Sequence, residues 1–259
     1  MRFGEQHHTD MEHLTGRVVV LPVASLEQHG HHLPLLTDSL ICEAIVRGVE
    51  AELGDRVVCL PLLWVGASEH HRRFPGTISI PPALFVSLLT HMVECLVEDG
   101  FRRIFVLNAH GGNDIPGRQA LLDVQLRHRE LSDLWLALGS YMDLASQQIA
   151  AMPQLVQKAV THSCELETSL ILHLRPELVR LGAARGANIP FNSAFYAPDF
   201  SRPSRVYVPR EYTHLSATGA FGHPELGTAE KGQDLLSVIV GEVVAFLREF
   251  SEWQPHEPG

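Results

Sequence analysis

Residues 21–38 read LPVASLEQHGHHLPLLTD and join an apolar run to a dense group of acidic and imidazole side chains. The apolar run begins slightly upstream, because residues 17–24, RVVVLPVA, have the β-branched composition of a short buried strand. Five side chains that can bind metal follow within twelve positions: Glu27, His29, His31, His32 and Asp38. Carboxylate oxygens and neutral imidazole nitrogens are accepted as ligands by Zn²⁺, Mn²⁺ and Fe²⁺. One histidine alone would be read as part of a polar surface loop, but the whole group predicts a metal site.

The rest of the sequence alternates short apolar segments with longer amphipathic ones. Strands are predicted at residues 56–65, 103–107 and 134–139, and helices at residues 39–53, 82–100, 115–129, 165–174 and 229–250. Strands that alternate with helices predict an α/β fold, with a mostly parallel sheet flanked by helices in three layers. Because no repeat or linker is present, we expect one domain over residues 1–259, with loose ends at 1–15 and 251–259.

Composition narrows the class of protein. The protein has 259 residues, of which 45% are hydrophobic and 19% charged, as in ordinary globular proteins. A formal net charge of −10 argues against a nucleic-acid partner, and no apolar run reaches the roughly 18 residues that a membrane span needs. The N-terminus does not resemble a signal peptide. The four cysteines include no CxxC pair, which argues for a reducing, cytoplasmic setting and against a thiolate zinc site.

Polar clusters recur at the predicted carboxyl ends of strands or at helix starts, around residues 27–38, 68–76, 108–114 and 161–167. In open α/β sheets, ligands bind outside the carboxyl ends of the strands. We therefore expect these clusters to converge on one site.

Residues 108–114, NAHGGND, allow several interpretations. The glycines permit a tight turn whose amides hold an anion. The nucleotide-binding patterns GxGxxG and GKS/T are absent, so a nucleotide fold has little support. His110 is the strong metal ligand of the turn, and a plain glycine-rich turn with a solvated histidine is the alternative.

Residues 161–169, THSCELETS, place His162, Glu165 and Glu167 at or near a helix start. Acidic residues in a first helical turn are common through the helix dipole alone, which explains Glu165 without any function. His162 and Glu167 are close enough in sequence to reach one site. Cys164 is a weaker candidate for a nucleophile, because no histidine–asparagine or histidine–aspartate arrangement is evident to activate it.

Residues 66–77, GASEHHRRFPGT, form a loop that can contact substrate. Polar contacts would come from Ser68, Glu69 and His70, and Arg72 or Arg73 would bind an anion. An ordinary charged surface loop is the alternative.

These segments together resemble the creatininase (creatinine amidohydrolase) family. The matching stretches are VASLEQHGHHLPLLTD, GASEHHRRFPGTISI, VLNAHGGN, HSCELETS and GAFGHPELGTAEKG, and they span residues from about 20 to 235. The resemblance implies a metal-dependent hydrolase of carbon–nitrogen bonds in small amides, built on one α/β domain. It also implies two divalent ions per protomer (Zn, Mn or Fe) and a dimeric or hexameric homo-oligomer.

Carried over residue by residue, the resemblance assigns metal-ligand positions to Glu27, His29, Asp38 and His110, with Asp38 as the bridge. His162 matches the family's catalytic histidine. The implied substrate-binding positions are Ser68, Glu69, His70, Gly111, Gly112 and Asn113.

Two departures from the creatinine-hydrolysing members matter. Gly112 stands where those members have a glutamate ligand, and we take Glu167 to replace it as ligand and catalytic group, with Glu165 left open. Those members also close the pocket with two tryptophans, whereas only Trp135 lies between Gly112 and His162 here. The second departure argues against creatinine itself as the substrate.

The expected chemistry is attack of a metal-activated water on an amide carbonyl. His162, whose residue type ordinarily titrates near neutrality, would protonate the leaving nitrogen. Lactam opening, hydrolysis of a formamide in flavin or deazaflavin precursor synthesis, and trimming of a modified peptide cofactor all remain open. A phosphorylated formamide would suit the loop arginines Arg72, Arg73, Arg202 and Arg205.

Two other classes of protein stay as alternatives. One is a metal-binding subunit without catalysis, and the other is a cysteine amidase that uses Cys164.

Residues 182–215 lack periodicity, and long loops of this kind usually serve function or subunit contacts. Their aromatic side chains Phe191, Phe195, Tyr196 and Phe200 are the expected contacts between subunits.

Overall fold

The computed structural model describes residues 1–157, 159–188, 193–197, 199 and 204–255. Within these residues, four strands form one sheet in the order β2-β1-β3-β4. The strands are β1 (Val18–Val23), β2 (Val57–Cys59), β3 (Arg103–Asn108) and β4 (Trp135–Ser140). Every pair is parallel, and β1 lies alongside the whole of β3. The predicted α/β fold with a parallel sheet is confirmed.

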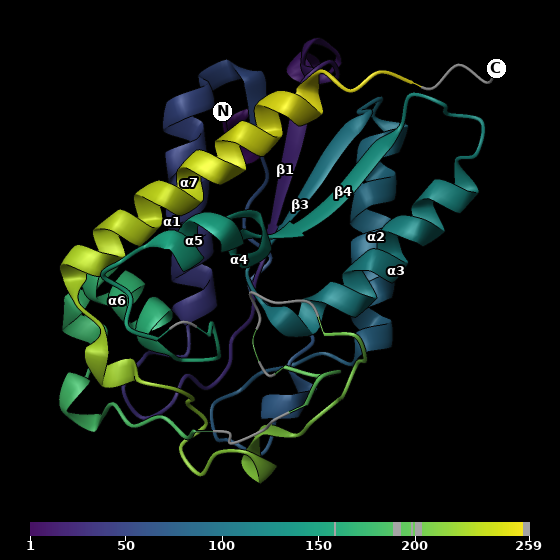
Figure 1. Ribbon diagram of the computed structural model, residues 1–259. Helices are drawn as coiled ribbons and strands as arrows, with labels where there is room; N and C mark the ends of the chain where they lie inside the picture. Colours follow the sequence, from purple (N-terminus) through teal and green to yellow (C-terminus); the bar gives the residue numbers. More distant parts are fainter. Residues whose placement is uncertain (158, 189–192, 198, 200–203, 256–259) are drawn as a thin grey trace.

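Helices cover both faces of this sheet (Figure 1). One face carries α1 (Thr37–Leu53), α4 (Tyr141–Leu144), α5 (Ser146–Ala151), α6 (Glu165–Leu174) and α7 (Ala229–Ser251). The other face carries α2 (Pro82–Glu98) and α3 (Asp114–Arg127). Side chains of β1 alternate between the two cores: Val18 and Val20 pack with α1 and α7, whereas Val19 and Leu21 pack with α2.

The second strand is shorter than the sequence predicts. We expect a strand over residues 56–65, but β2 ends at Cys59. Leu60 N still donates to Val20 O, but Pro22, the next β1 residue on this side, has no N–H to give, so the ladder stops there and resumes only as an isolated bridge between Val23 and Leu63. The irregular segment that follows leads to the loop of residues 66–80 at the carboxyl edge of the sheet.

The two ends of the protein also differ in detail from the expectation of loose arms. Residues 1–15 contain two 3-10 helices, Phe3–Glu5 and His8–Leu14, and Leu14 is buried in the core beside α2. At the other end, α7 reaches Ser251, and residues 256–259 lie outside the described residues. Among the described residues, no helix is long and apolar enough to cross a membrane.

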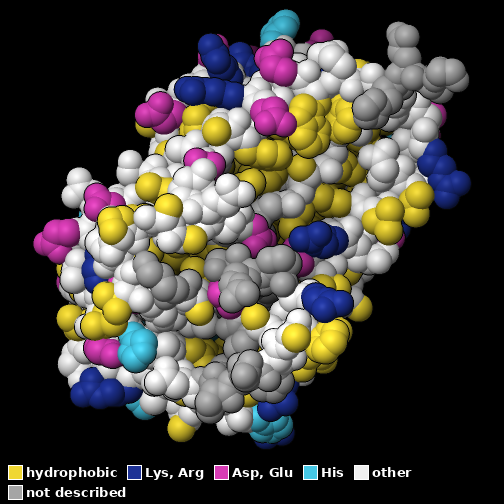
Figure 2. Space-filling model, viewed as in Figure 1, with side chains coloured by type: hydrophobic (Ala, Val, Ile, Leu, Met, Phe, Trp, Pro, Cys, Tyr) yellow, Lys and Arg dark blue, Asp and Glu magenta, His cyan; other side chains and the backbone are white. Residues whose placement is uncertain are grey.

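The described residues among 182–215 lie beyond the carboxyl ends of the strands (Figure 1). Their described part contains only short 3-10 turns, Leu181–Ala183 and Tyr212–His214. Phe195 is exposed, whereas Phe191, Phe200 and Arg202 lie outside the described residues. Hydrophobic side chains also show between α7 and α3, over the edge strand β4, whose residues are all partly exposed (Figure 2).

Candidate metal centre

Predicted site residues from three loops meet at the carboxyl edge of the sheet. Glu27, His29 and Asp38 follow β1, and His110 follows β3. His162 and Glu167 come from the start of α6. All six side chains are buried. The convergence arises because parallel strands place their carboxyl ends on one edge.

The first group of candidate ligands contains Glu27, Asp38 and His110, whose ligand atoms lie within 4.8 Å of one another. His110 Nδ1 lies 3.1 Å from Glu27 Oε2 and 3.4 Å from Asp38 Oδ2. Asp38 Oδ2 is buried and has no hydrogen-bond partner among the described residues. Buried carboxylate oxygens are costly without a partner, and a divalent cation between these three side chains would supply one.

The second group contains His29, His162 and Glu167, again within 4.8 Å. The other oxygen of Asp38, Oδ1, lies 3.0 Å from His29 Nε2. Asp38 therefore presents one oxygen toward each group, an arrangement that suits a carboxylate shared by two cations.

Glu165 and Glu167 both lie in the first turn of α6, and their carboxylates point to different places. Glu165 accepts hydrogen bonds from Lys231 Nζ at 2.6 Å and from the backbone amide of Val156 at 3.1 Å. Glu167 accepts one from the amide of Ser163 and belongs to the second group. The geometry favours Glu167 as the ligand and gives Glu165 a structural contact.

Three histidines of the centre share one mode of attachment, in which one ring nitrogen meets a backbone carbonyl. The distances are 3.1 Å from His29 Nδ1 to Glu27 O, 3.3 Å from His110 Nε2 to Ala67 O, and 2.8 Å from His162 Nε2 to Gln28 O. A carbonyl can only accept, so the nitrogen facing it carries hydrogen. In the neutral ring the opposite nitrogen then has a free lone pair directed at the carboxylates, which is how metal-binding histidines are usually held.

The carboxylates make this centre attractive to positive charge. Burial alone would lower the pKa of His29, but the surrounding carboxylates, Asp38 foremost and then Glu167 and Glu27, together outweigh it and raise the pKa to about 9. Burial likewise opposes protonation of His110, and the Glu27 and Asp38 carboxylates together nevertheless raise its pKa to about 10. A cluster that attracts protons this strongly has the charge to hold divalent cations.

Two other groups have altered pKa values. Burial, followed by the nearby charge of His29, lowers the pKa of His162 to about 3, so this ring is neutral at pH 7. That differs from the sequence-based expectation of titration near neutrality. Burial raises the pKa of Glu167 to about 7, although the His29 charge opposes it.

The turn that carries His162 has an unusual backbone. Ser163 has φ 56°, and it is the one non-glycine residue with positive φ among the described residues. Its amide donates to Glu167 Oε2, so the reversal brings His162 and Glu167 to the same centre. The next residue, Cys164, is buried, and burial raises the pKa of its thiol to about 11. A thiol in this state is a poor nucleophile, which weighs against the cysteine amidase alternative.

A cavity of about 660 Å³ opens above the centre. Four of the predicted substrate-binding residues line it: Glu69, His70, Gly111 and Gly112. The side chains of Ser68 and Asn113 do not line the cavity, and they form hydrogen bonds inside the protein instead. Ser68 Oγ bonds Glu27 and lies 3.0 Å from His110 Nε2, and Asn113 Nδ2 donates to Ala24 O at 3.0 Å.

The arginines expected to bind phosphate do not gather at the cavity in the part of the protein that the structure describes. Arg72 donates to Thr77 O at 2.8 Å, and the Arg205 guanidinium lies 4.8 Å from the centre of the Phe195 ring. Arg202 lies outside the described residues. Arg210, which the sequence analysis does not single out, lines the cavity.

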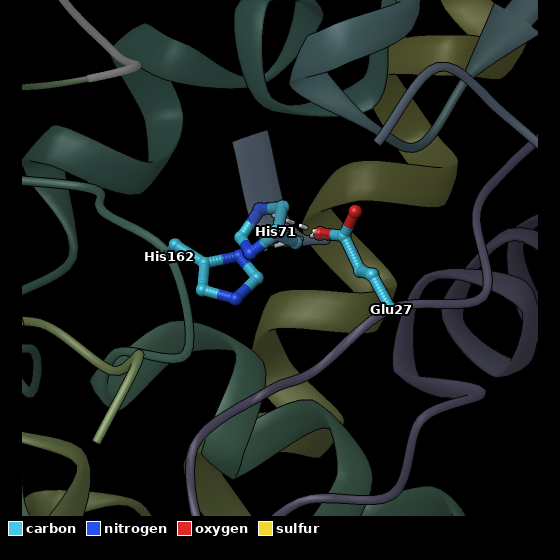
Figure 3. A group of neighbouring side chains, drawn as sticks. All are labelled: Glu27, His71 and His162. Carbon is cyan, nitrogen blue, oxygen red and sulfur yellow. Dashed lines mark ion pairs between the residues drawn. The ribbon is translucent and has the colours of Figure 1, made fainter. Parts of the chain in front are cut away.

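Sequence reasoning also missed His71 and Tyr212. His71 Nε2 lies 3.3 Å from Glu27 Oε1, and Figure 3 shows these two side chains facing each other beside His162. The Tyr212 ring packs on His71 with ring centroids 4.3 Å apart. His71 stands beside His70 in the sequence, and only the direction of the local 3-10 turn decides which ring points at Glu27.

Comparisons with known proteins find relatives that match most of the sequence. The family model described as Creatininase: Creatinine amidohydrolase matches residues 5–247. The sequence is 29% identical over 257 residues to the mycofactocin precursor peptide peptidase of Mycobacterium tuberculosis (strain CDC 1551 / Oshkosh), covering 95% of this protein and 89% of the relative. It is 28% identical over 245 residues to the creatinine amidohydrolase of Pseudomonas putida, covering 90% and 89%.

Solved structures of creatininases have the same fold. A structure described as creatininase Mn superposes with a TM-score of 0.77 at 26% identity, covering 96% of this protein and 97% of that one. A creatininase mutant of Zn–Zn type gives 0.77 at 25% identity, with the same coverage. Because the family model spans nearly the whole sequence and the buried carboxylates and histidines lie within that span, the protein belongs to the creatininase family of amidohydrolases.

Proposed function

We propose that this metal-dependent hydrolase of carbon–nitrogen bonds holds two divalent ions and cleaves an amide. One ion would lie between Glu27, Asp38 and His110, and the other between His29, Asp38 and Glu167. The observation that carries the proposal is the sharing of Asp38, whose two oxygens face two separate groups of buried ligands. Bound ions would lower the pKa of a shared water and polarise the amide carbonyl.

Two side chains would exchange protons at this centre. His162 is neutral, and its Nδ1 lies 3.6 Å from Glu27 Oε1, so its lone pair faces the centre and can accept a proton. The same nitrogen can then return the proton to the departing amide nitrogen. Glu167, whose pKa burial raises to about 7, would hold a proton before the second ion binds and would release it when that ion takes its place.

The cavity supports a substrate larger than one small ring. Its volume of about 660 Å³ falls within the range of about 300–1,000 Å³ typical of sites for drug-sized ligands. Apolar residues on its wall include Ile115, Met142, Val206 and Tyr207. A peptide or other extended amide is therefore a second candidate beside a lactam or formamide, and one of the relatives is named as a peptidase.

We further propose a homo-oligomer, a dimer or hexamer, that works in the cytoplasm. Four unpaired cysteines suit a reducing compartment. The exposed aromatic ring of Phe195 and the partly exposed edge strand β4 are the surfaces that support contacts between copies.

Metal content per protomer tests the proposal. Elemental analysis of protein purified without chelator should give about two divalent ions, because two groups of ligands are present. Asp38→Ala should lose most of both, and Glu167→Gln should keep about one. Glu43→Gln removes an exposed carboxylate from the same helix as Asp38 and should leave the content unchanged. A wild-type protein that takes up no zinc or manganese on titration would end this proposal.

Activity separates the hydrolase from a non-catalytic metal-binding subunit. His162→Gln should lower kcat by about 10²–10⁴ on whichever formamide, lactam or short peptide the wild type hydrolyses, because a proton carrier is removed. Metal content should stay close to that of the wild type. Equal activity in both proteins would favour the metal-binding subunit.

A further inference from the structure

Gln28 follows Glu27 in the loop after β1, and its side chain reaches the segments that carry His71, His162 and Gly219. Its side chain is buried, and its amide can be oriented from its backbone partners alone. The amide of Gly30 donates to Oε1 at 2.9 Å, and Nε2 donates to the carbonyl of Gly219 at 3.1 Å. A backbone N–H and a backbone C=O cannot exchange roles, so the oxygen and nitrogen of Gln28 are fixed.

The second hydrogen on Gln28 Nε2 has one available acceptor. His71 Nδ1 lies 2.8 Å away and His162 Nε2 lies 3.1 Å away. His162 Nε2 already carries the hydrogen that it gives to the backbone carbonyl of Gln28 at 2.8 Å, so it cannot accept another. His71 Nδ1 therefore accepts, and in a neutral ring the hydrogen of His71 stands on Nε2.

That hydrogen points at the metal centre. His71 Nε2 lies 3.3 Å from Glu27 Oε1, and the dashed line in Figure 3 marks this pair. In the neutral form that binds a cation, His29, His110 and His162 would direct a lone pair at the carboxylates, whereas neutral His71 directs an N–H at Glu27. An N–H cannot bind a cation, so the grouping of Glu27, His71 and His162 lacks the donor set of a third metal site.

We infer that Gln28 fixes the hydrogen of His71 on Nε2 and thereby makes His71 a positioning residue that holds Glu27 Oε1. The other oxygen, Oε2, is then held at 3.1 Å from His110 Nδ1, where the first ion would lie. The effect on metal binding rests on the function proposed above, whereas the position of the hydrogen on His71 does not.

Gly219 gives this arrangement a second test. It has φ 84°, and a Cβ added to it would overlap the amide of Gln28. Gly219→Ala therefore displaces the Gln28 side chain from outside, without altering His71 or any candidate ligand.

The direct experiment is solid-state ¹⁵N NMR of protein labelled in histidine, which separates protonated from bare ring nitrogens whatever the size of the assembly. The His71 signals are identified as those missing from the spectrum of His71→Gln. In metal-free wild type they should show a bare Nδ1 and a protonated Nε2. Gln28→Glu replaces the donor by an acceptor and should place hydrogen on Nδ1. Gly219→Ala should also disturb the His71 signals. A protonated Nδ1 in neutral wild-type His71, or no change at Nδ1 in Gln28→Glu, would overturn the inference.

Zinc affinity, measured by competition with a chromophoric chelator, tests the positioning. His71→Leu removes the N–H and should weaken binding about 10–100-fold, as loss of an outer contact usually does. His71→Gln keeps an N–H near the position of Nε2 and should restore most of the affinity. His91→Leu, at an exposed position of α2, is the control and should bind like the wild type.

Equal losses in His71→Leu and His71→Gln, or no loss in the leucine variant, would contradict the positioning role. If the wild type binds no zinc, the proposed function fails, and the NMR result alone decides where the hydrogen of His71 stands.

Discussion

His32 lies beside the candidate metal centre and belongs to neither group of candidate ligands. Its Nε2 is 3.0 Å from Thr168 Oγ1, while its Nδ1 is buried without a hydrogen-bond partner among the described residues. A protonated ring would bury an N–H with no acceptor. Burial, and then the neighbouring His29, lower the pKa of His32 to about 4.

This lowered pKa predicts a loss of stability in acid. An unfolded His32 binds a proton below pH about 6.5, whereas the folded one stays neutral down to pH about 4, so the free energy of unfolding falls across that window. Between pH 6.5 and 5 the fall from this residue should be between about 1 and 2 kcal/mol. Urea unfolding in chelator, for wild type and His32→Gln at both pH values, measures it. If the free energy of unfolding falls equally between the two pH values in wild type and His32→Gln, other groups cause the acid sensitivity.

Single residues are also where sequence reasoning reached its limit. It placed metal-binding residue types in loops that the structure brings together, but it did not separate His71 from His70. In a 3-10 turn, consecutive side chains point about 120° apart, so one position changes what a residue contacts. The role of Gln28 depends on Gly219 and His162, which are remote in sequence, and no local pattern reports such contacts.

At the scale of elements, α6 and α7 are joined by a buried ion pair. Lys231 Nζ lies 2.6 Å from Glu165 Oε1, and the two side chains are 16% and 1% exposed. Glu165 also accepts from the amide of Gln157, so it ties the segment before α6 to the start of α7. Removing one partner of a buried pair leaves an unpaired charge in a medium that solvates it poorly.

Lys231→Met should therefore destabilise the protein by about 3–5 kcal/mol. The matched control is Arg118→Met on α3, which breaks an exposed pair with Asp114 and should cost less than about 1 kcal/mol. Denaturant unfolding of the metal-free proteins gives both values. Similar costs for the two variants would mean that Glu165 is solvated or finds another partner.

Elements with a long periodic pattern were predictable, and short ones were not. The bounds of α6 agree with the prediction, and α7 is one residue longer than predicted. Helices α4 and α5 have four and six residues, too few to show a helical period, and they were missed. The shortening of β2 follows from Pro22 in the neighbouring strand β1, which the pattern of residues 56–65 alone does not report.

At the scale of the whole molecule, alternation of strands and helices was enough to predict the parallel sheet. The convergence of the polar clusters then followed from topology, because parallel strands share a carboxyl edge. The cavity wall was not predictable. Residues such as Val206, Tyr207 and Arg210 belong to a segment without periodicity, and their positions depend on contacts with the rest of the fold.

The candidate ligands are spread over 140 positions, from Glu27 to Glu167, and this spacing has a consequence for the folding pathway. No short piece of the sequence holds a complete site, so an ion finds only part of either ligand set until β1, β3 and α6 are docked. Metal should then act late, after the transition state. Stopped-flow refolding should proceed at equal rates in zinc and in chelator, while unfolding should be markedly slower with zinc. Faster refolding in zinc would instead mean that part of the centre forms early and guides the docking of the sheet.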